Sequence, residues 1–564
     1  MIVGLHVGPH DSSAAIVEDG VVLAMMEQER FDHKKHSGAF PFDALSFCLE
    51  HGGVQLHDVA AVAYASEVDL TNHYKRLFIE SGHAGAFTPS FNQQADFDRS
   101  LSSKLSFNGR LFHLDHHLGH AASVFFTCPF EESAILTVDG VGNWVTTSFA
   151  VGRGTSIETL ERIGHPHSLG LFYGAVTQFL GFHALCDEGK TMGLAPYGRP
   201  TYADIFRSHV ALDDGGLAVD LDYYTFHEGP ITDSFGKPRR WFSQKFVETF
   251  GPPRTPEGEI SERDADIAAS AQLVLEERCY QLLKRLHRLT NTENLCVAGG
   301  VALNCSMNGK IRDCTPFRNV FVMPAAGDAG LSAGAALWGS RVLEPGFRRR
   351  EIGHAYLGSE HGDREIEAAI RASGHDVAVE RPADLVESVA ALLAGFAIVG
   401  WYQGRMECGP RALGHRSILA NPTRADMKDI VNAKVKFREM FRPFAPVVPL
   451  ELAAEYFNPG HANPFMLQVV SVLPDKQAVI PSVTHVDGSA RVQTITAEQE
   501  PQIHRLLLAM KARNGVPVLL NTSFNIRGDT IVRTPNDALH CFLTTGMDAL
   551  AIGPYLLRKR NVSR

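Results

Sequence analysis

The sequence predicts an α/β protein of two domains, the first of which contains two copies of one α/β unit. Three observations support this. After a first β-rich run at residues 2–6, two further β-rich runs at 13–18 and 21–27 flank Asp19-Gly20, a pair that is typical of a hairpin turn. A second stretch, residues 133–154, repeats the pattern, with Asp139-Gly140 after a strand-like run. Around residues 340–360 the hydrophobic periodicity stops, which indicates a domain boundary. The repeated hairpins favour a duplicated, actin-like (ASKHA) architecture for the first domain.

The elements that follow the second hairpin can be predicted in order. Residues 167–182 have apolar positions at helical spacing, and residues 187–200 resemble a loop. Residues 261–290 predict a long amphipathic helix whose N-cap is Ser261. The apolar strand in "NLCVAGGVALN" (294–304) then leads to a Gly-Gly turn, a type of turn that lets backbone N–H groups approach a phosphate. We therefore place the first domain at residues 1–347.

The remainder, residues 348–564, is long enough for a separate α/β domain. Its expected strands lie in "FAIVGWYQG" (396–404), "GVPVLLNTS" (515–523) and "ALAIGPYLL" (549–557), with helices between them.

Composition excludes several classes of protein. The formal net charge of −10 argues against a general polyanion binder such as a nucleic-acid protein. No run of about 18 apolar residues predicts a membrane span, and the N-terminal stretch reads as a strand, so we expect neither a membrane anchor nor a secretion signal. Nine cysteines without a C-x-x-C pair argue against a disulfide framework or a thiolate zinc site. A reducing, cytoplasmic location is expected.

The stretch "FHLDHHLGHAAS" (112–123) contains a candidate metal site. His116 and His120 are four residues apart, so on a helix both imidazoles lie on one face, whereas His117 points elsewhere. Asp139 and Asp328 each follow a strand-like run, where open α/β sheets place ligand groups. Two imidazoles and two carboxylates suit Fe²⁺, Mn²⁺ or Zn²⁺. Spacing alone leaves open the alternatives of an incidental histidine pair and of turn aspartates that cap N–H groups.

The second domain carries many cations among glycine, serine, aromatic and proline residues. In a chain of negative net charge, this pattern suggests a pocket for phosphate groups rather than a solvated charged face. The cations lie in "GRMECGPRALGHRS" (404–417), which contains Arg405, Arg411 and Arg416; in "NAKVKFREMFRPFAP" (432–446), which contains Lys434, Lys436, Arg438 and Arg442; and beside Ser523, Asn525 and Arg527.

Two glycine-rich turns each carry a histidine and an aspartate: "GPHDSS" (8–13) and "HVDGSARVQTI" (485–495). A His-Asp pair can serve general base catalysis on a hydroxyl. Adjacent residues in a strand point to opposite faces, so we do not expect His10 and Asp11 to form a simple dyad. Lys34 and Lys35 supply a cationic edge near the first turn.

Taken together and in this order, these motifs resemble the O-carbamoyltransferase family of NodU, CmcH and TobZ over essentially the whole length. The motifs that carry the resemblance are "HDSSAAIVEDG", "EQERFDHKKH", "DHHLGHAAS", "GKTMGLAPYG", "GGVALNCSMNGK", "GPRALGHRSILANP", "KFREMFRPFAP", "HVDGSARVQT" and "LLNTSFNIRGDTIV". The resemblance implies an N-terminal ASKHA domain similar to TsaD and a C-terminal α/β domain similar to YrdC. It also implies that carbamoyl phosphate and ATP are converted to carbamoyladenylate, from which a substrate hydroxyl takes the carbamoyl group.

The resemblance also assigns roles to residues. His116, His120, Asp139 and Asp328 match the family's iron site, and Mg²⁺ is an expected second metal. His10 matches the histidine proposed to activate the acceptor hydroxyl, Lys35 a neighbouring cation, and Arg491 a residue that reaches toward the intermediate. Lys436 and Arg438 resemble a K-x-R pair, and Ser523 and Asn525 an S-x-N pair, that hold nucleotide phosphates. Arg411, Arg416 and Arg527 are expected beside them as ligands of carbamoyl phosphate and ATP.

The favoured function is therefore carbamoylation of a hydroxyl on a small natural product, as in antibiotic or other secondary metabolism. A tRNA threonylcarbamoyladenosine-type enzyme is the first alternative, and the net charge argues against it. A non-catalytic nucleotide- and metal-binding regulator is the second. The acceptor is not predictable from the sequence, although regions 64–110 and 200–260 are candidates for its pocket. A homodimer is compatible with the sequence but not indicated by it.

Overall fold

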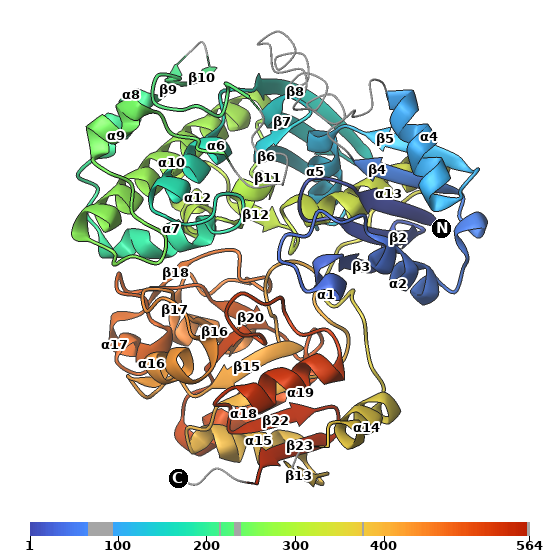
Figure 1. Cartoon of the computed structure of the whole chain (residues 1–564), viewed down its shortest axis with the longest axis vertical. Coiled ribbons are helices and arrows are strands. Elements are labelled where there is room, and N and C mark those ends of the chain that lie inside the picture. The colour runs from blue at the N-terminus through green and yellow to red at the C-terminus, as the bar shows by residue number, and fades with distance from the viewer. Residues whose placement is uncertain (66–93, 214–215, 230–238, 375–376, 561–564) are drawn as a thin grey trace. The chain divides into compact units, whose positions relative to one another are not determined.

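The computed structural model describes residues 1–65, 94–213, 216–229, 239–374 and 377–560 (Figure 1). The chain divides into two compact units. Unit 1 comprises residues 1–28 and 36–351, and unit 2 comprises residues 29–35 and 352–564. The short segment Glu29–Lys35, which includes helix α1 (Glu29–Asp32), therefore belongs with the C-terminal unit although it lies far away in the sequence.

Unit 1 begins with a five-stranded sheet in the order β3-β2-β1-β4-β5. Its strands are β1 (Ile2–His6), β2 (Ser13–Glu18), β3 (Val21–Glu27), β4 (Ala61–Ala65) and β5 (Arg110–Leu114). The β1–β2 and β2–β3 pairs are antiparallel, whereas β1–β4 and β4–β5 are parallel. The predicted hairpin turn is confirmed, because Asp19 and Gly20 both have positive φ, at 50° and 77°.

The second sheet of unit 1 repeats this topology, in the order β8-β7-β6-β11-β12. Its strands are β6 (Glu132–Gly142), β7 (Val145–Arg153), β8 (Ser156–Gly164), β11 (Asn294–Ala298) and β12 (Asn319–Val322). The first three strands are again antiparallel to one another, and the β6–β11 and β11–β12 pairs are again parallel. Two sheets of identical order and direction show the duplicated, actin-like fold.

Two of the sequence-based assignments in unit 1 are wrong in detail. Asp139-Gly140 is not the turn of the second hairpin: β6 continues to Gly142, and the turn falls at Asn143 and Trp144, which have positive φ. The register of β6 shifts between Val138 and Gly142, so the Asp-Gly pair lies in this irregular part of the strand instead. The stretch 187–200, expected as a loop, contains helix α7 (Glu188–Leu194) and a 3₁₀ turn (Ala195–Tyr197).

Two helices lie between the sheets of unit 1 and bring the sheets together. Helix α13 (Leu331–Leu343) packs against β1, β2 and β4, and helix α5 (His116–Phe125) packs against β6, β7 and β11. The two helices also pack on each other, so closely that a side chain at Gly334 would meet the carbonyl oxygen of Gly119 at 2.1 Å. This contact fixes α5 relative to the start of α13, where candidate site residues lie.

The other elements of unit 1 surround these two sheets. The predicted helix is α10 (Glu262–Thr290), with Ser261 as N-cap in a capping box with Asp264, and the apolar stretch 167–182 forms α6 (Leu169–Phe179). The remaining elements are α2 (Phe42–Gly52), a 3₁₀ turn (Leu56–Asp58), α4 (Gln94–Leu105), α8 (Ala203–His209), β9 (Val210–Asp213), β10 (Gly216–Val219), α9 (Gln244–Phe250), a 3₁₀ turn (Gly300–Leu303), α11 (Cys305–Gly309), α12 (Ile311–Cys314) and a 3₁₀ turn (Asp328–Gly330). Of the two candidate acceptor regions, residues 66–93 of the first and residues 214–215 and 230–238 of the second lie outside the described residues.

Unit 2 is an α/β unit built on an eight-stranded mixed sheet, in the order β13-β23-β22-β14-β15-β21-β16-β20. Its strands are β13 (Val377–Glu380), β14 (Val399–Tyr402), β15 (Arg416–Ala420), β16 (Ala445–Pro449), β20 (Gln493–Ile495), β21 (Leu519–Ser523), β22 (Ala549–Ile552) and β23 (Tyr555–Lys559). Between β16 and β20 the chain forms a separate small sheet of β17 (Phe457–Asn458), β18 (Val470–Val472) and β19 (Ser489–Ala490).

Alternating residues of the large sheet feed two separate cores. Ala549 and Ala551 of β22 pack with α15 (Leu385–Ala394) and α18 (Pro501–Asn514), whereas Leu550 and Ile552 belong to the opposite core. That second core includes residues of α14 (Asp363–Ala372), α16 (Met427–Val431) and α19 (Pro535–Thr544), and a short helix, α17 (Pro474–Gln477), lies nearby in the sequence. Because both faces of the sheet are covered, successive residues of β22 are all buried and apolar. The strand therefore reads as a continuous apolar run in the sequence.

Candidate functional site

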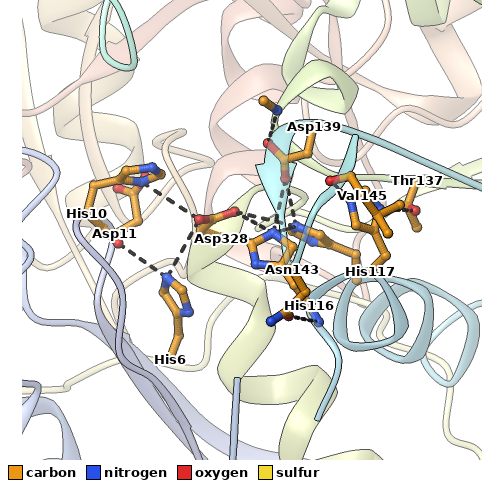
Figure 2. A network of polar contacts seen from close by, with 12 residues as sticks. His6, His10, Asp11, His116, His117, Thr137, Asp139, Asn143, Val145 and Asp328 are labelled. Carbon is orange, nitrogen blue, oxygen red and sulfur yellow. Dashed lines mark hydrogen bonds and ion pairs between the residues drawn. The ribbon is translucent and has the colours of Figure 1, made fainter. Parts of the chain in front are cut away.

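A cluster of imidazole and carboxylate groups lies at the start of α5 in unit 1. Asp115 caps the helix by accepting a hydrogen bond from the Leu118 N–H at 3.0 Å. His116 and His120 follow one turn apart, both buried, with their Nε2 atoms 3.0 Å from each other. The predicted shared face is confirmed. His117 points away, as expected: its ring nitrogens lie 2.7 Å from Thr137 Oγ1 and 2.9 Å from the Val145 carbonyl oxygen (Figure 2).

Two aspartates from distant parts of the sequence complete this cluster. Asp139, in the irregular part of β6, has Oδ2 at 2.8 Å from His120 Nε2 and 3.5 Å from His116 Nε2. Asp328, in the turn before α13, has Oδ1 at 3.4 Å from His120 Nε2 and 3.6 Å from His116 Nε2. The structure thus brings together four residues that the sequence separates by more than two hundred positions.

The donor set fits a divalent metal ion. One ligand atom from each of the four residues lies within 4.8 Å of all the others. Metal–ligand distances of 2.0–2.2 Å put neighbouring ligands of a tetrahedral site roughly 3.3–3.6 Å apart. The four Nε2–carboxylate distances, 2.8–3.6 Å, are close to this spacing. Two imidazoles and two carboxylates suit Fe²⁺, Mn²⁺ or Zn²⁺ equally well, so the residues do not select among them.

The electrostatics of the cluster favour its charged forms. Burial alone would raise the pKa of Asp139, but hydrogen bonds with His116 and His120 outweigh it and hold this pKa well below its ordinary value. Burial lowers the pKa of His120, yet hydrogen bonds to Asp139 and Asp328 outweigh it and leave this pKa raised. The protons of this cluster therefore balance the charge of Asp139 and Asp328. A divalent cation bound in their place would balance it equally well.

Asp328 also joins this cluster to a second set of histidines. Its Oδ2 lies 3.6 Å from His6 Nε2 and 3.8 Å from His10 Nδ1, so it stands between the two sets (Figure 2). His6 Nε2 in turn lies 3.2 Å from the His10 carbonyl oxygen. Burial lowers the pKa of His6 to about 4, which makes this imidazole neutral at neutral pH.

The expectation that His10 and Asp11 form no simple dyad rests on a strand geometry that is wrong here. His10 Nδ1 lies 3.0 Å from Asp11 Oδ2, because residues 7–12 form a turn rather than a strand and Asp11 has a φ of 53°. The other carboxylate oxygen of Asp11 lies 2.8 Å from His36 Nδ1. Burial would raise the pKa of Asp11, but His36 and His10 lower it below its ordinary range, so the carboxylate is charged between two imidazoles.

Sequence analysis missed His6, Asp11 as a partner of His10, and His36. A usable signal for Asp11 was its residue type, since Asp and Asn tolerate positive φ, and it lies in a glycine- and proline-containing turn. Lys35, predicted as the cation near His10, is exposed and belongs to unit 2, where its charge acts on Lys436. Its predicted role stays a prediction.

Unit 2 contains a cluster centred on Lys436. The Lys436 Nζ atom donates to oxygens of two residues: Asn525 Oδ1 at 2.6 Å, Ser523 O at 2.9 Å, Asn525 O at 3.0 Å and Ser523 Oγ at 3.1 Å. Lys436 ends a π-helical turn (Asn432–Lys436), and Ser523 ends β21. The K-x-R and S-x-N motifs, 87 residues apart, therefore meet at the end of β21, an inner strand of the large sheet.

Arginines crowd this lysine. Arg438 Nε donates to Asn432 Oδ1 at 3.2 Å, and its guanidinium lies 4.4 Å above the Phe444 ring. Burial and the charges of Arg442 and Arg491 lower the pKa of Arg438 well below its ordinary value. Burial and Arg438 lower the pKa of Lys436 in the same way. Because these cations disfavour one another's charge, an anion bound beside them would stabilise the charged forms of both.

The other predicted phosphate ligands occupy different environments. Arg527 is exposed, and its Nη2 lies 3.7 Å from Glu439 Oε1. Arg411 is partly buried in the loop 408–415. Arg416 is fully buried: its terminal nitrogens donate to the carbonyl oxygens of Gln403, Gly404, Ser359 and His415, and its guanidinium lies 3.7 Å above the Tyr402 ring. Arg416 thus holds main chain together, and we do not include it among the proposed ligands.

One buried acid near this cluster was not singled out from the sequence. Glu407 Oε1 accepts hydrogen bonds from the N–H groups of Leu413 at 2.7 Å, His415 at 2.8 Å and Arg416 at 3.1 Å. These contacts fix the loop that carries Arg411. The signal was available, because Glu407 is the only acidic residue in "GRMECGPRALGHRS".

Comparisons with known proteins bear on both units. Residues 1–337 match the family model described as "Carbamoyltransferase N-terminus", and residues 390–559 match "Carbamoyltransferase C-terminus". The chain is 39% identical to nodulation protein NolNO of Sinorhizobium fredii, over 98% of this chain and 80% of that protein. It is 41% identical to nodulation protein NolO of Bradyrhizobium diazoefficiens, over 80% of each chain. An uncharacterized protein of Synechocystis is 37% identical, over 99% of this chain and 96% of that protein.

None of the helices in the described residues combines the length and the apolar character that a membrane crossing requires.

Proposed function

The chain belongs to the carbamoyltransferase family, and we propose that it is an ATP-dependent O-carbamoyltransferase for a hydroxyl group of a small natural product. One water converts carbamoyl phosphate to carbamate and phosphate. A carbamate oxygen then displaces pyrophosphate from ATP to form carbamoyladenylate, and the acceptor hydroxyl displaces AMP from the carbamoyl carbon. In this proposal unit 2 makes the adenylate and unit 1 transfers the carbamoyl group.

The observation that carries the proposal is the presence in one chain of two clusters with complementary chemistry. The Lys436 cluster gathers cations beside the hydroxyl and amide of Ser523 and Asn525, which suits nucleotide phosphates. The cluster in unit 1 sets a metal-binding quartet beside a His-Asp pair, which suits proton removal from a hydroxyl. Neither cluster alone accounts for both steps of the reaction.

Activation as an adenylate is needed because the carbamoyl group is a poor electrophile. Its nitrogen donates electron density into the carbonyl, so a weak nucleophile such as a hydroxyl attacks slowly. AMP is a better leaving group than the oxygen of free carbamate. A metal ion bound by His116, His120, Asp139 and Asp328 would supply Lewis-acid stabilisation of the negative charge on the leaving phosphate.

The side chains around His10 would handle the proton. We assign His10 as the base that takes the proton of the acceptor hydroxyl, with Asp11 fixing the orientation of the imidazole through the 3.0 Å contact at Nδ1. With Nδ1 held in this way, Nε2 is the atom that receives the proton. The neutral His6, whose Nε2 contacts the His10 carbonyl oxygen, supports the same turn.

The first half-reaction can be tested without knowing the acceptor. The full chain is incubated with Fe²⁺, Mg²⁺, ATP and carbamoyl phosphate, and pyrophosphate and the mass of carbamoyladenylate are measured. The proposal expects both products, dependent on carbamoyl phosphate and lost in Lys436→Ala. Lys434→Ala is the matched control, because Lys434 lies in the same π-helical turn but is exposed.

Two results would contradict the proposal. Adenylate formed from bicarbonate and threonine, but not from carbamoyl phosphate, would move the protein to the tRNA-modifying class. Binding of ATP without turnover of either donor, even with a panel of hydroxylated acceptors, would favour the non-catalytic regulator.

A further inference from the structure

A phenylalanine stands between the two phosphate-binding candidates of unit 2. Phe437 separates Lys436 from Arg438, and its side chain is 53% exposed although both neighbours are largely buried. Met440, three residues further on, is 52% exposed. Large apolar side chains next to buried cations are unusual, because the ordinary arrangement is the reverse.

The backbone holds Phe437 in a conformation that few side chains adopt. It has a φ of 46° and a ψ of 45°, the left-handed region that favours glycine. The preceding residues form a π-helical turn, a feature common at functional sites, and the Phe437 N–H closes it by donating to the Asn432 carbonyl oxygen at 2.7 Å. The Asn432 side chain also accepts from Arg438 Nε at 3.2 Å, so one asparagine fixes the chain on both sides of Phe437. A strained and exposed residue held this firmly indicates a function.

Packing does not explain the ring. Phe444, in the same segment, is buried and lies 4.4 Å below the Arg438 guanidinium. Across the described part of the chain, by contrast, Phe437 has neither an aromatic nor a cationic partner for its ring. About half of the side chain is therefore exposed, with no aromatic or cationic group of the described residues stacked on the ring.

We propose that Phe437, flanked by Met440, is the platform on which the base of the nucleotide stacks while Lys436 and Arg438 hold its phosphates. Residues 436–438 span at most about 7 Å of extended backbone, so a base and the phosphates of one nucleotide can engage neighbouring side chains. The proposal rests on the proposed function and adds the residue that recognises the base. Stacking needs only a π face, so it should favour purines over inorganic polyphosphate rather than read a particular hydrogen-bonding edge.

The test separates base contacts from phosphate contacts. Dissociation constants for ATP and for inorganic tripolyphosphate are measured by calorimetry with the full chain and its variants. Phe437→Ala should weaken ATP binding by roughly 5- to 150-fold, the range expected for one base–aromatic stack, and leave tripolyphosphate binding unchanged. Phe437→Trp should retain ATP affinity and show fluorescence quenching by ATP but not by tripolyphosphate.

The chain offers a matched control. Phe396 is also in unit 2, has a φ of 65° and is 39% exposed, but lies in the turn after α15. Phe396→Ala removes the same ring from a similarly strained backbone and should leave both dissociation constants unchanged. This control separates loss of the platform from a general effect of losing an exposed phenylalanine.

The outcomes are distinguishable from failure of the proposed function. If the unmodified protein binds neither ATP nor tripolyphosphate, the proposed function and the platform both fail. If it binds ATP and Phe437→Ala leaves that constant unchanged, only the platform is wrong. Equal weakening of ATP and tripolyphosphate by Phe437→Ala would also overturn it, because the ring would then support the cations rather than the base.

Discussion

The two clusters differ in the balance of their charges. In unit 1, buried carboxylates face buried imidazoles, and the hydrogen bonds between them stabilise the charged forms of Asp139 and His120. In unit 2, Lys436, Arg438 and nearby arginines face one another, and each disfavours the charge of the next. The first cluster is balanced without a ligand and needs only to exchange protons for a metal ion. In the second, Glu439 compensates Arg438 only in part, and a bound anion would stabilise the charged forms of Lys436 and Arg438. The charge that each cluster lacks therefore indicates its ligand: a metal cation in unit 1 and an anion in unit 2.

The largest expected effect follows from breaking the metal-binding quartet. His120→Ala removes the imidazole that lies closest to Asp139. The metal affinity should therefore fall by more than about 100-fold, because losing a ligand costs more than changing the residues that support the ligands. Carbamoyl transfer should be lost, while pyrophosphate release by unit 2 continues. Metal content by mass spectrometry and pyrophosphate release measure the two effects.

His117→Gln is the control for that experiment. His117 is buried on the same helix but contacts Thr137 and Val145, and glutamine retains a hydrogen-bonding side chain. The His117→Gln variant should therefore bind metal as the unmodified protein does. Loss of metal in both variants would mean that helix α5 as a whole, rather than the ligand set, had been disturbed.

A smaller effect is expected from the His-Asp pair beside the metal-binding quartet. Asp11→Asn removes the charge between His10 and His36 but tolerates the positive φ at this position. Because positioned acid–base groups contribute 10²–10⁴-fold, carbamoyl transfer should fall by roughly 100-fold. AMP release with a hydroxylated acceptor measures it. Unchanged metal content and adenylate formation are expected, and loss of either would indicate a structural role for Asp11.

These two sites also show how far the sequence can be interpreted. The i, i+4 spacing of His116 and His120 was sufficient to place both imidazoles on one helix face, but only the family resemblance selected Asp139 and Asp328 as their partners, because spacing left capping aspartates as an equal alternative. The duplicated hairpins likewise predicted the fold. His36 could not be predicted as a partner of Asp11, since that contact depends on a turn whose path has no period. The buried role of Arg416 was also hidden, because an arginine that binds carbonyl oxygens and one that binds phosphate look the same in sequence.

The crowding of cations in unit 2 predicts a pH dependence. Because the pKa of Lys436 is lowered in the free protein, a bound phosphate should restore its charge and take up a proton. Affinity for sulfate, an anion that is fully ionised throughout this range, should therefore fall as the pH rises from about 7 to about 9.5, by up to about tenfold per pH unit once Lys436 is deprotonated. Calorimetry across this range measures it.

Lys436→Met sharpens the result, because it cannot titrate. Its weaker binding should be independent of pH over the same range. If the pH dependence survives in Lys436→Met, another group takes up the proton, and Lys436 is not the group whose charge the anion restores.

The smallest effect is expected at the exposed edge of the same cluster. Arg527 is 40% exposed and lies 3.7 Å from a Glu439 oxygen, so its charge is already screened by solvent and partly compensated. Arg527→Ala should weaken ATP binding by only about 2- to 5-fold, the range of a modest surface interaction, and the difference should shrink at high salt. Dissociation constants at two ionic strengths measure it. A loss as large as that of Lys436→Ala, and insensitive to salt, would mean that Arg527 folds onto the nucleotide, and the contrast between buried and exposed cations in unit 2 would no longer hold.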